Sequence, residues 1–143
     1  MEVRFLDNDS DYSAVLEVLL QLRTTYDFDS LSAQVKKQQA NGYQVVYVKS
    51  PGGILAVAGF VVGEKLAWGK YIYIDDLVTN TNDRSTGVGK FLIDWFKAYA
   101  LENGCEQIHL DSGVQRFPAH KFYLREGFNI ASHHFSLLDV KNA

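Results

Sequence analysis

The sequence predicts a mixed α/β (α+β) fold with a mainly antiparallel central sheet and helices on both of its faces. Two observations lead to this prediction. Three strand-like segments, 43–48, 54–62 and 70–79, follow one another through short turns, as the strands of an antiparallel meander do. The last of them leads to a long amphipathic helix and then to another strand, which is the order of a strand–helix–strand crossover.

The segments before the meander supply one strand and two helices. Residues 2–6 alternate as a short strand, and 9–11 offer a helix cap before a run of apolar residues at helical spacing. Ser30 can cap a second helix that ends near Asn41-Gly42. The apolar stripe of the first helix consists of Val15, Leu16, Val18, Leu19 and Leu22.

The meander is punctuated by two turns, 50–53 and 63–69. Its middle segment, 54–62, is wholly apolar, so we expect a central strand covered on both faces. A third strand over 70–79 completes the meander.

The crossover helix is the clearest helix of the chain. It begins near Gly87 and ends at Asn103-Gly104. A strand over 107–111 and a short helix over 117–126 follow. A last strand over 130–140 either pairs across a homodimer or closes the chain's own sheet. One face of the long helix carries Val88, Phe91, Leu92, Trp95, Phe96 and Tyr99.

Size and composition are those of one globular domain, expected over residues 1–143. The net charge of −3 argues against a nucleic-acid partner. The longest apolar run is too short to span a membrane, so no membrane partner is expected. The start of the chain lacks the features of a signal peptide, and the single cysteine, Cys105, cannot form an internal disulfide. Both points favour a cytoplasmic location.

A glycine-rich turn over residues 84–89 joins the third meander strand to the long helix. A helix N-terminus presents backbone N–H groups to phosphate, and Arg84 adds a positive charge. The turn is not a P-loop, because Lys90 is followed by Phe91 and not by Ser or Thr. It is not a dinucleotide loop either, because Leu92 stands where that loop requires a small residue.

The pattern R-x-x-G-x-G between strand and helix resembles the acyl-CoA pyrophosphate loop of the GNAT N-acetyltransferase superfamily. The strand end DDLVT over 75–79 is similar to the family's strand before that loop, and 118–128 resembles its closing signature A-x-x-F-Y-x-x-x-G-F. The matched region runs from about Tyr71 to Phe128, and the first 70 residues carry no diagnostic motif.

The resemblance implies an acetyl-CoA-dependent N-acetyltransferase, in which a primary amine attacks the donor directly in a ternary complex. It implies that Leu77, Val78 and Thr79 contact the pantetheine arm and that the Val78 amide polarises the thioester carbonyl. The pyrophosphate would be held by Arg84, Ser85, Thr86, Gly87, Val88, Gly89 and Lys90.

The resemblance makes Tyr123 the candidate acid for the leaving thiolate. A phenol with a pKa near 10 can protonate a thiolate whose pKa is about 8.5. The alternative is a tyrosine that packs beside Phe122. The family often has Asn where this chain has Arg116, and whether Arg116 reaches a phosphate or faces solvent stays open.

The resemblance makes Asp75 the candidate base for the amine, because an acid at this position takes the amine proton in family members that resemble polyamine acetyltransferases. Strand alternation places Tyr73, Asp75 and Leu77 on one face and the residues between them on the other. One of the two neighbouring aspartates should therefore face the acceptor, and Asp76 or solvent remain alternatives to Asp75 as the base.

The acceptor is expected to be a small cationic amine or a lysine side chain. Residues 26–29, Tyr-Asp-Phe-Asp, fall in the loop that commonly lines the acceptor pocket in the family, and carboxylates with aromatic rings favour a cation. The alternative is a solvated polar loop.

No metal site is expected. His133 and His134 would point to opposite faces of a strand, and His109 with Asp111 gives only two ligands. Two other functions compete with the enzyme: a non-catalytic acyl-CoA-binding sensor or regulatory module, and a different phosphate-ligand domain.

Overall fold

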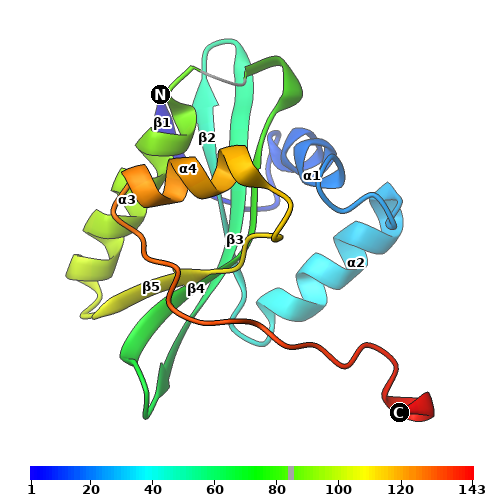
Figure 1. Cartoon of the computed structure of the whole chain (residues 1–143). Helices are drawn as coiled ribbons and strands as arrows, with labels where there is room; N and C mark the ends of the chain where they lie inside the picture. Colours follow the sequence, from blue (N-terminus) through cyan, green and yellow to red (C-terminus); the bar gives the residue numbers. More distant parts are fainter. Residues whose placement is uncertain (84–85) are drawn as a thin grey trace. The chain divides into compact units, whose positions relative to one another are not determined.

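A computed structural model of the chain describes residues 1–83 and 86–143, which form two compact units, Met1–Leu110 and Asp111–Ala143. Within the described residues, the first unit contains a five-stranded sheet and three α-helices (Figure 1). The second unit contains one α-helix and an extended C-terminal segment. The predicted mixed α/β fold is confirmed.

The strands and α-helices of the first unit follow one another in the order that the sequence predicts. Their bounds are β1 (Glu2–Phe5), α1 (Tyr12–Leu20), α2 (Phe28–Gln39), β2 (Gln44–Ser50), β3 (Gly53–Lys65), β4 (Gly69–Thr79), the 3₁₀ turn η1 (Thr81–Asp83), α3 (Val88–Glu102) and β5 (Gln107–Leu110). The second unit contains α4 (Phe117–Arg125) and the 3₁₀ turn η2 (Val140–Asn142).

The strands lie in the order β1-β2-β3-β4-β5. The first three pairings are antiparallel, and the β4–β5 pairing across the α3 crossover is parallel. The β3–β4 hairpin is tighter than expected, because β3 continues to Lys65, which pairs with Gly69. The predicted turn over 63–69 therefore shrinks to 66–68.

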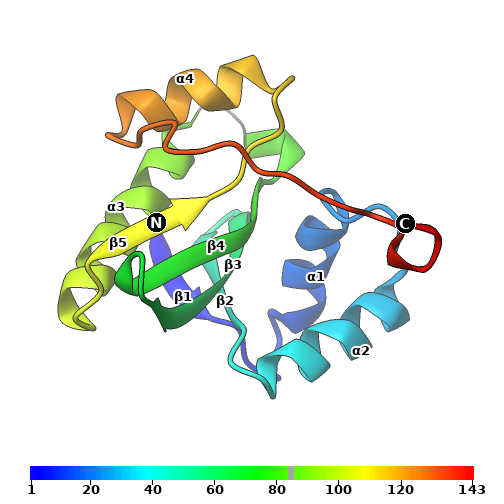
Figure 2. The same cartoon turned by 60° about the horizontal axis from the view of Figure 1, so that its bottom comes forward.

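Helices cover both faces of the sheet, with α1 and α2 on one face and α3 on the other (Figure 2). On the α3 face, Phe60 packs at ring-centroid distances of 5.1 to 6.4 Å against three rings of α3, namely Trp95, Phe96 and Tyr99. The expectation that the middle meander strand is buried on both faces is confirmed. On the α1–α2 face the core includes Val15, Leu16, Val18, Leu19, Leu31, Val35, Val45, Tyr47 and Val57.

Helix α2 begins earlier than the Ser30 cap predicts. Its N-cap is Asp27, whose carboxylate accepts a hydrogen bond from the Ser30 backbone N–H at 2.8 Å. The Ser30 hydroxyl accepts in return from the Asp27 backbone N–H at 3.0 Å. Both residues are good cap formers, and a capping box uses them together, with Asp27 outside the helix and Ser30 at its third position.

The predicted last strand over 130–140 is wrong. The described structure has no strand after β5, and residues 130–139 form no regular element. Phe135 and Leu138 are 90% and 93% exposed. An alternating apolar pattern forms a strand only where a neighbour completes its hydrogen bonds, and none of the described strands pairs with this segment.

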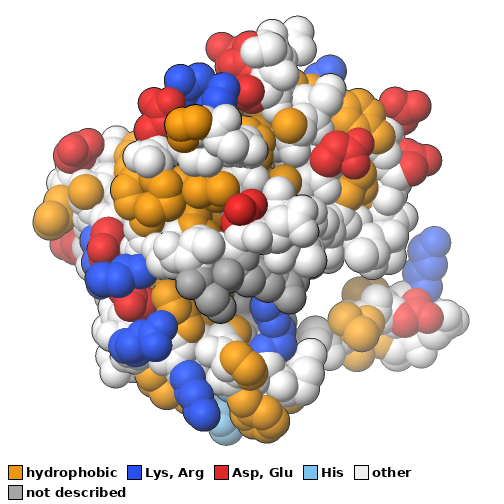
Figure 3. Space-filling view, turned by 90° about the horizontal axis from the view of Figure 1, so that it is seen from above, with side chains coloured by type: hydrophobic (Ala, Val, Ile, Leu, Met, Phe, Trp, Pro, Cys, Tyr) orange, Lys and Arg blue, Asp and Glu red, His pale blue; other side chains and the backbone are white. Residues whose placement is uncertain are grey.

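The described surface mixes side chains of different kinds. The face in Figure 3 exposes Lys and Arg as well as Asp and Glu side chains, with hydrophobic side chains between them. Over residues 1–83 and 86–143, none of the helices combines the length and the apolar character needed to cross a bilayer.

Candidate active site

A β-bulge at Asp75 shifts the register of β4. On β3, the neighbours Gly59 and Phe60 pair with Asp76 and Ile74, so Asp75 is the extra residue of the bulge. Tyr73 and Asp76 therefore share the α1–α2 face, although their positions differ by three. The simple alternation that placed Asp75 and Leu77 with Tyr73 is wrong, because one extra residue exchanges the faces of all that follow.

The Asp76 carboxylate is held by two partners. Its Oδ1 accepts from Arg23 Nε at 2.8 Å, and its Oδ2 accepts from the Tyr43 hydroxyl at 2.6 Å. Only 13% of the side chain is exposed. Both carboxylate oxygens are thus engaged in structural contacts.

The neighbouring Asp75 has a different environment. Its backbone carbonyl accepts from Arg23 Nη2 at 3.0 Å, and the residue is exposed at the bulge. Of the two aspartates, Asp75 is the one whose side chain is more accessible to a substrate.

Tyr43 reaches Asp76 by crossing Gly59, the residue of β3 that pairs with Asp76. A Cβ atom on Gly59 would overlap the Tyr43 hydroxyl and ring. Burial raises the pKa of Tyr43 well above its ordinary value, and the negative charge of Asp76 raises it further. The phenol therefore stays protonated and donates to the carboxylate.

One edge of β4 loses its strand neighbour beyond the bulge. The parallel ladder with β5 ends at the pair Ile74–Leu110. Leu77, Val78 and Thr79 remain paired with β3 on their other side. Among the described strands none covers their second edge, so the backbone groups of this edge can pair with an extended ligand.

The predicted phosphate loop is described from Thr86 onward, and the predicted contacts of Arg84 and Ser85 lie outside the described residues. Gly87 is the N-cap of α3 with φ +81°, a left-handed conformation that glycine adopts without strain. Nothing lies within 4 Å of a Cβ built on Gly87, so this position needs glycine for its backbone angle and not for space. The Thr86 hydroxyl donates to the Asp83 carbonyl at 2.7 Å.

The first turn of α3 contains the other predicted loop residues. Val88 is buried, which anchors the helix start, and the N–H groups of Val88 and Gly89 belong to the first turn, where helical bonding gives no partner. The Lys90 ammonium contacts the Asp94 carboxylate four residues on, at 3.1 Å. Both side chains are exposed, so this ion pair contributes little to stability.

Tyr123 lies on α4, in the second unit. Its ring contacts those of Phe122 and Phe128 at centroid distances of 5.4 and 5.7 Å. Burial raises the pKa of the phenol, and the Arg116 guanidinium opposes part of that rise. Tyr123 is therefore a protonated donor at neutral pH, as a proton source for a thiolate must be. Arg116 itself is exposed at the N-cap of α4.

The proposed acceptor loop is partly structural. Asp27 caps α2, and the hydrogen bond from the Ser30 backbone lowers its pKa. Phe28 is the first residue of α2 and packs against the core. Tyr26 and Asp29 are exposed. Two of the four residues thus have a role in the fold, which weakens the charge argument at this loop.

The sequence did not indicate Arg23, Tyr43 or Gly59 as site residues. They come from the α1–α2 connection, from the residue before β2 and from β3, and nothing local marks them. A glycine inside a wholly apolar strand was the one available signal, because such a glycine often marks the close approach of another group.

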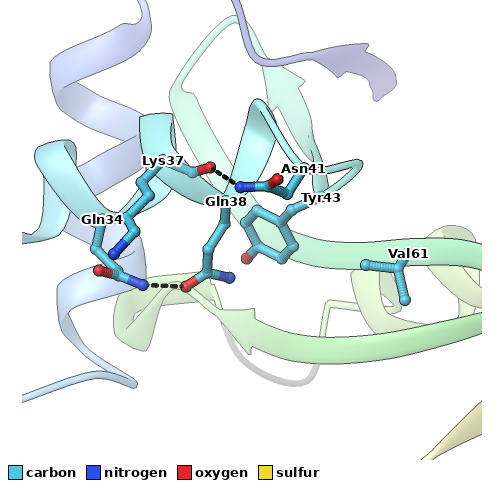
Figure 4. Close-up of a pocket in the computed structure, with 6 residues that line it drawn as sticks. All are labelled: Gln34, Lys37, Gln38, Asn41, Tyr43 and Val61. Atoms are coloured by element: carbon cyan, nitrogen blue, oxygen red, sulfur yellow. Dashed lines mark hydrogen bonds between the residues drawn. The ribbon is translucent and has the colours of Figure 1, made fainter.

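A hollow of about 210 Å³ lies beside Tyr43, between α2 and the sheet (Figure 4). Gln34 Nε2 donates to Gln38 Oε1 and Asn41 Nδ2 to the Lys37 carbonyl, both at 3.0 Å. Side-chain amides and one lysine thus form its polar wall, which does not suit a cation. It is lined by Gln34, Lys37, Gln38, Asn41, Tyr43 and Val61.

Three of the histidines in the described part of the chain, His109, His120 and His134, are engaged in other contacts. His109 stacks on Trp68 at 3.4 Å, and His134 Nδ1 lies 3.0 Å from the Asp111 carboxylate. Over residues 1–83 and 86–143, no three His, Cys, Asp or Glu side chains are grouped so that they could hold a metal ion.

The chain is similar to known acetyltransferases. A model of the acetyltransferase (GNAT) family matches residues 12–128. YhdJ of Bacillus subtilis (strain 168), an uncharacterized N-acetyltransferase, is 30% identical over 140 residues, which cover 94% of this chain and 96% of YhdJ. Glucosamine 6-phosphate N-acetyltransferase 1 of Dictyostelium discoideum is 31% identical over 109 residues, 73% of this chain and 69% of that protein.

A solved structure shares the fold. The crystal structure of glucosamine-6-phosphate N-acetyltransferase from Arabidopsis thaliana has a TM-score of 0.75 and 21% identity, and the match covers 96% of this chain and 97% of that one.

Proposed function

Because the chain belongs to the acetyltransferase (GNAT) family, we propose that it is an acetyl-CoA-dependent N-acetyltransferase that acts on a primary amine. The observation that carries this proposal is the uncovered edge of β4 at Leu77–Thr79 in the same unit as the N-terminus of α3. An extended amide-bearing arm can pair with the strand edge, and a pyrophosphate can bind the helix amides.

The residues present fit a CoA co-substrate. The pantetheine arm has amide groups that suit the backbone of Leu77, Val78 and Thr79. The left-handed Gly87 begins α3 without a capping side chain, which leaves the first helix amides of Val88 and Gly89 to an anion. Thr86 and Lys90, with Arg84 and Ser85, complete the proposed pyrophosphate loop.

Acyl transfer in a ternary complex proceeds in three steps. The acceptor ammonium gives a proton to Asp75, directly or through water, and the free amine attacks the thioester carbonyl carbon. The developing oxyanion accepts a hydrogen bond from the Val78 amide. As the C–N bond forms and the C–S bond breaks, the thiolate takes a proton from the Tyr123 phenol and leaves as CoA thiol. The nitrogen then gives its second proton to the Tyr123 phenolate, which restores the phenol and yields the neutral amide, and Asp75 releases the first proton to solvent.

We propose a small primary amine as the acceptor, attracted as a cation by the exposed Asp75 carboxylate. The engaged carboxylate of Asp76 makes that residue a poor base. A lysine side chain fits the same chemistry. Glucosamine 6-phosphate, named for the Dictyostelium relative, is also a primary amine and is therefore included in the test.

The direct test is release of CoA thiol from acetyl-CoA over a panel of amines. The panel includes a polyamine, glucosamine 6-phosphate, a lysine peptide and a neutral hydroxyl compound as control. Turnover with the amines and none with the hydroxyl compound supports the proposal. Activity only with neutral or acidic acceptors would contradict the role of Asp75.

Binding calorimetry with CoA, ATP and NAD separates the remaining alternatives. Preference for CoA together with turnover supports the enzyme. Preference for CoA without turnover on any amine indicates a sensor, and preference for ATP or NAD indicates a different phosphate-ligand domain. A homodimer is tested by sedimentation.

A further inference from the structure

Arg23 joins the α1–α2 connection to both residues of the bulge. Its Nε donates to the Asp76 carboxylate at 2.8 Å and its Nη2 to the Asp75 carbonyl at 3.0 Å. The guanidinium is planar and its donors have a fixed geometry, so two such bonds fix the peptide unit between the two aspartates. A lysine ammonium donates from a single atom at the end of a flexible chain, so it could not hold the two acceptors in the same fixed geometry.

Tyr43, the residue before β2, holds the same carboxylate. Its hydroxyl donates to the second Asp76 oxygen at 2.6 Å and passes over Gly59. Asp76 is therefore anchored by the α1–α2 connection through Arg23 and by the residue that precedes β2 through Tyr43. Removal of either partner would leave a largely buried charge with unsatisfied hydrogen-bonding capacity, which is costly.

The bulge is the place where β4 most needs such support. A bulge interrupts the β3–β4 ladder locally, and the β5 ladder ends one residue earlier, at Ile74. Contacts from side chains must replace the missing strand contacts there. The direction of the Asp75 side chain and the positions of the backbone amides of Leu77–Thr79 both depend on the backbone angles at the bulge.

The same connection also reaches the far end of the uncovered edge. Gln21 Oε1 accepts from the Thr81 backbone N–H at 3.0 Å and from its hydroxyl at 2.8 Å. Gln21 Nε2 donates to Asn80 Oδ1 at 3.2 Å. Residues 21–23 thus hold β4 on both sides of Leu77–Thr79.

We infer that Arg23, with Asp76 and Tyr43, is a positioning device that fixes the β4 bulge, and through it Asp75 and the edge Leu77–Thr79, in the geometry of acyl transfer. This inference rests on the proposed function. None of the three residues touches the reacting atoms. Their effect passes through the backbone of β4, where a displacement of about 1 Å can lower a rate by about a hundredfold.

The first test is the kinetics of Arg23→Ala against a matched control, Arg4→Ala. The two arginines are equally exposed, 45% and 46%, and each pairs with carboxylates, but Arg4 contacts Glu2 and Asp11 and not β4. We expect kcat of Arg23→Ala to fall about 10- to 100-fold, by more than acetyl-CoA affinity falls, because the pyrophosphate site at α3 is untouched. Arg23→Lys should recover part of the loss.

A double-mutant cycle shows whether Arg23 acts through Asp76. The effects of Arg23→Ala and Asp76→Asn on kcat should not add, because each change removes the same contact and so frees the same peptide unit between Asp75 and Asp76. Tyr43→Phe keeps the ring and removes only the hydroxyl, so it tests the same path if Asp76→Asn does not fold. Additive effects, or a kcat for Arg23→Ala equal to that of Arg4→Ala, would overturn the inference.

Amide hydrogen exchange separates this inference from the proposed function, because it needs no substrate. Exchange at Leu77–Thr79 should be faster in Arg23→Ala than in the wild type and unchanged in Arg4→Ala. If amides of Leu77–Thr79 exchange in Arg23→Ala at the same rate as in the wild type, the positioning role is overturned even if activity is lost. Faster exchange in a protein that acetylates no amine would support the device and contradict the enzyme.

Discussion

The Tyr43 hydroxyl occupies the space that a side chain on Gly59 would need. Gly59 pairs with Asp76 across the β3–β4 ladder, and Tyr43 uses the opening at Gly59 to reach that carboxylate. One glycine in a buried strand therefore determines whether the bulge of β4 has its second anchor.

We predict that Gly59→Ala destabilises the fold by about 1–3 kcal/mol, because the methyl group displaces a buried ring that cannot move freely. Urea unfolding measures the change. The control is Gly52→Ala, where the nearest atom to the new Cβ is at an ordinary 3.7 Å.

The cause is checked in a second background. If the clash with Tyr43 is responsible, Gly59→Ala should cost less when Tyr43 is already alanine. An equal cost in both backgrounds would show that the methyl group acts on something other than the tyrosine.

The two neighbouring aspartates should respond differently to replacement by asparagine. Asp76→Asn should lower the free energy of unfolding by about 1–3 kcal/mol, because it loses the charge-assisted bonds from Arg23 and Tyr43. Asp75→Asn should lower kcat by about a hundredfold if Asp75 is the base. Urea unfolding and CoA-release kinetics measure the two quantities.

This contrast also identifies the base. If Asp75→Asn retains full turnover with its pH dependence unchanged, solvent takes the amine proton and Asp75 has no catalytic role.

Gly87 should matter for CoA and not only for stability. Gly87→Ala forces a left-handed angle on alanine and should lower stability by about 1 kcal/mol. It should also weaken CoA binding, because relaxation of the N-cap turns the first amides of α3 away from the anion. Calorimetry with CoA measures this loss.

Gly104 provides the matched control at the other end of α3. It has φ +69° and, like Gly87, no atom within 4 Å of a built Cβ. Gly104→Ala should lower stability similarly and leave CoA binding unchanged. Equal CoA affinity in the two variants would remove Gly87 from the pyrophosphate site.

Tyr123→Phe should lower kcat about 100-fold with little change in acetyl-CoA affinity, because it removes the proton for the thiolate and keeps the ring contacts. Burial raises the Tyr123 pKa, so in the wild type the acid is lost only above the ordinary phenol pKa of about 10. The kinetics of the two proteins as a function of pH measure both effects. Unchanged turnover in Tyr123→Phe would leave Tyr123 as a packing residue.

Stability should depend on pH through Asp11. The hydrogen bonds from Lys49 and Tyr47 hold the Asp11 pKa below its usual value. The ionised form is therefore favoured in the folded state, and the contribution is present above the unfolded pKa and lost as pH falls through the lower, folded one. Urea midpoints at neutral pH and at about pH 3 measure the loss, which Asp11→Asn should reduce.

Tyr47 gives the opposite sign at high pH. Burial and its hydrogen bond to Asp11 raise the Tyr47 pKa to about 12. Its neutral form is favoured in the folded state, so its contribution is present below the unfolded pKa and is lost as pH rises from about 10 toward about 12. Tyr47→Phe should remove that dependence.

The sequence was sufficient for the regular elements that depend on local patterns. The meander strands and the long helix followed from apolar periodicity and glycine punctuation, and the structure confirms them. The same patterns could not decide between Asp27 and Ser30 as a cap, since both residue types cap helices. They also placed a strand at 130–140, because alternation does not reveal whether a neighbouring strand exists.

The candidate site residues were predictable where a short run of neighbouring residues matches a motif. The strand end 75–79, the loop before α3 and the signature that contains Tyr123 are three such runs. The bulge could not be predicted, because Asp75-Asp76 continues a strand pattern without interruption. Its anchor Arg23 could not be predicted either, because it stands 53 positions before Asp76. The pairing of β4 with β3, which leaves no local signature in the sequence, determines which face of the sheet each residue of β4 after Asp75 lies on.

The ties from Gln21 and Arg23 to β4 have a consequence for redesign of the acceptor. Residues 24–26 can be exchanged or lengthened while Gln21 and Arg23 keep their contacts with β4 and with the residues after it, and Asp27 and Phe28 stay because they cap α2 and pack against the core. A transplant that begins at Gln21 would instead remove these contacts. The boundary between Arg23 and Thr24 therefore separates the residues that hold β4 from the proposed acceptor loop.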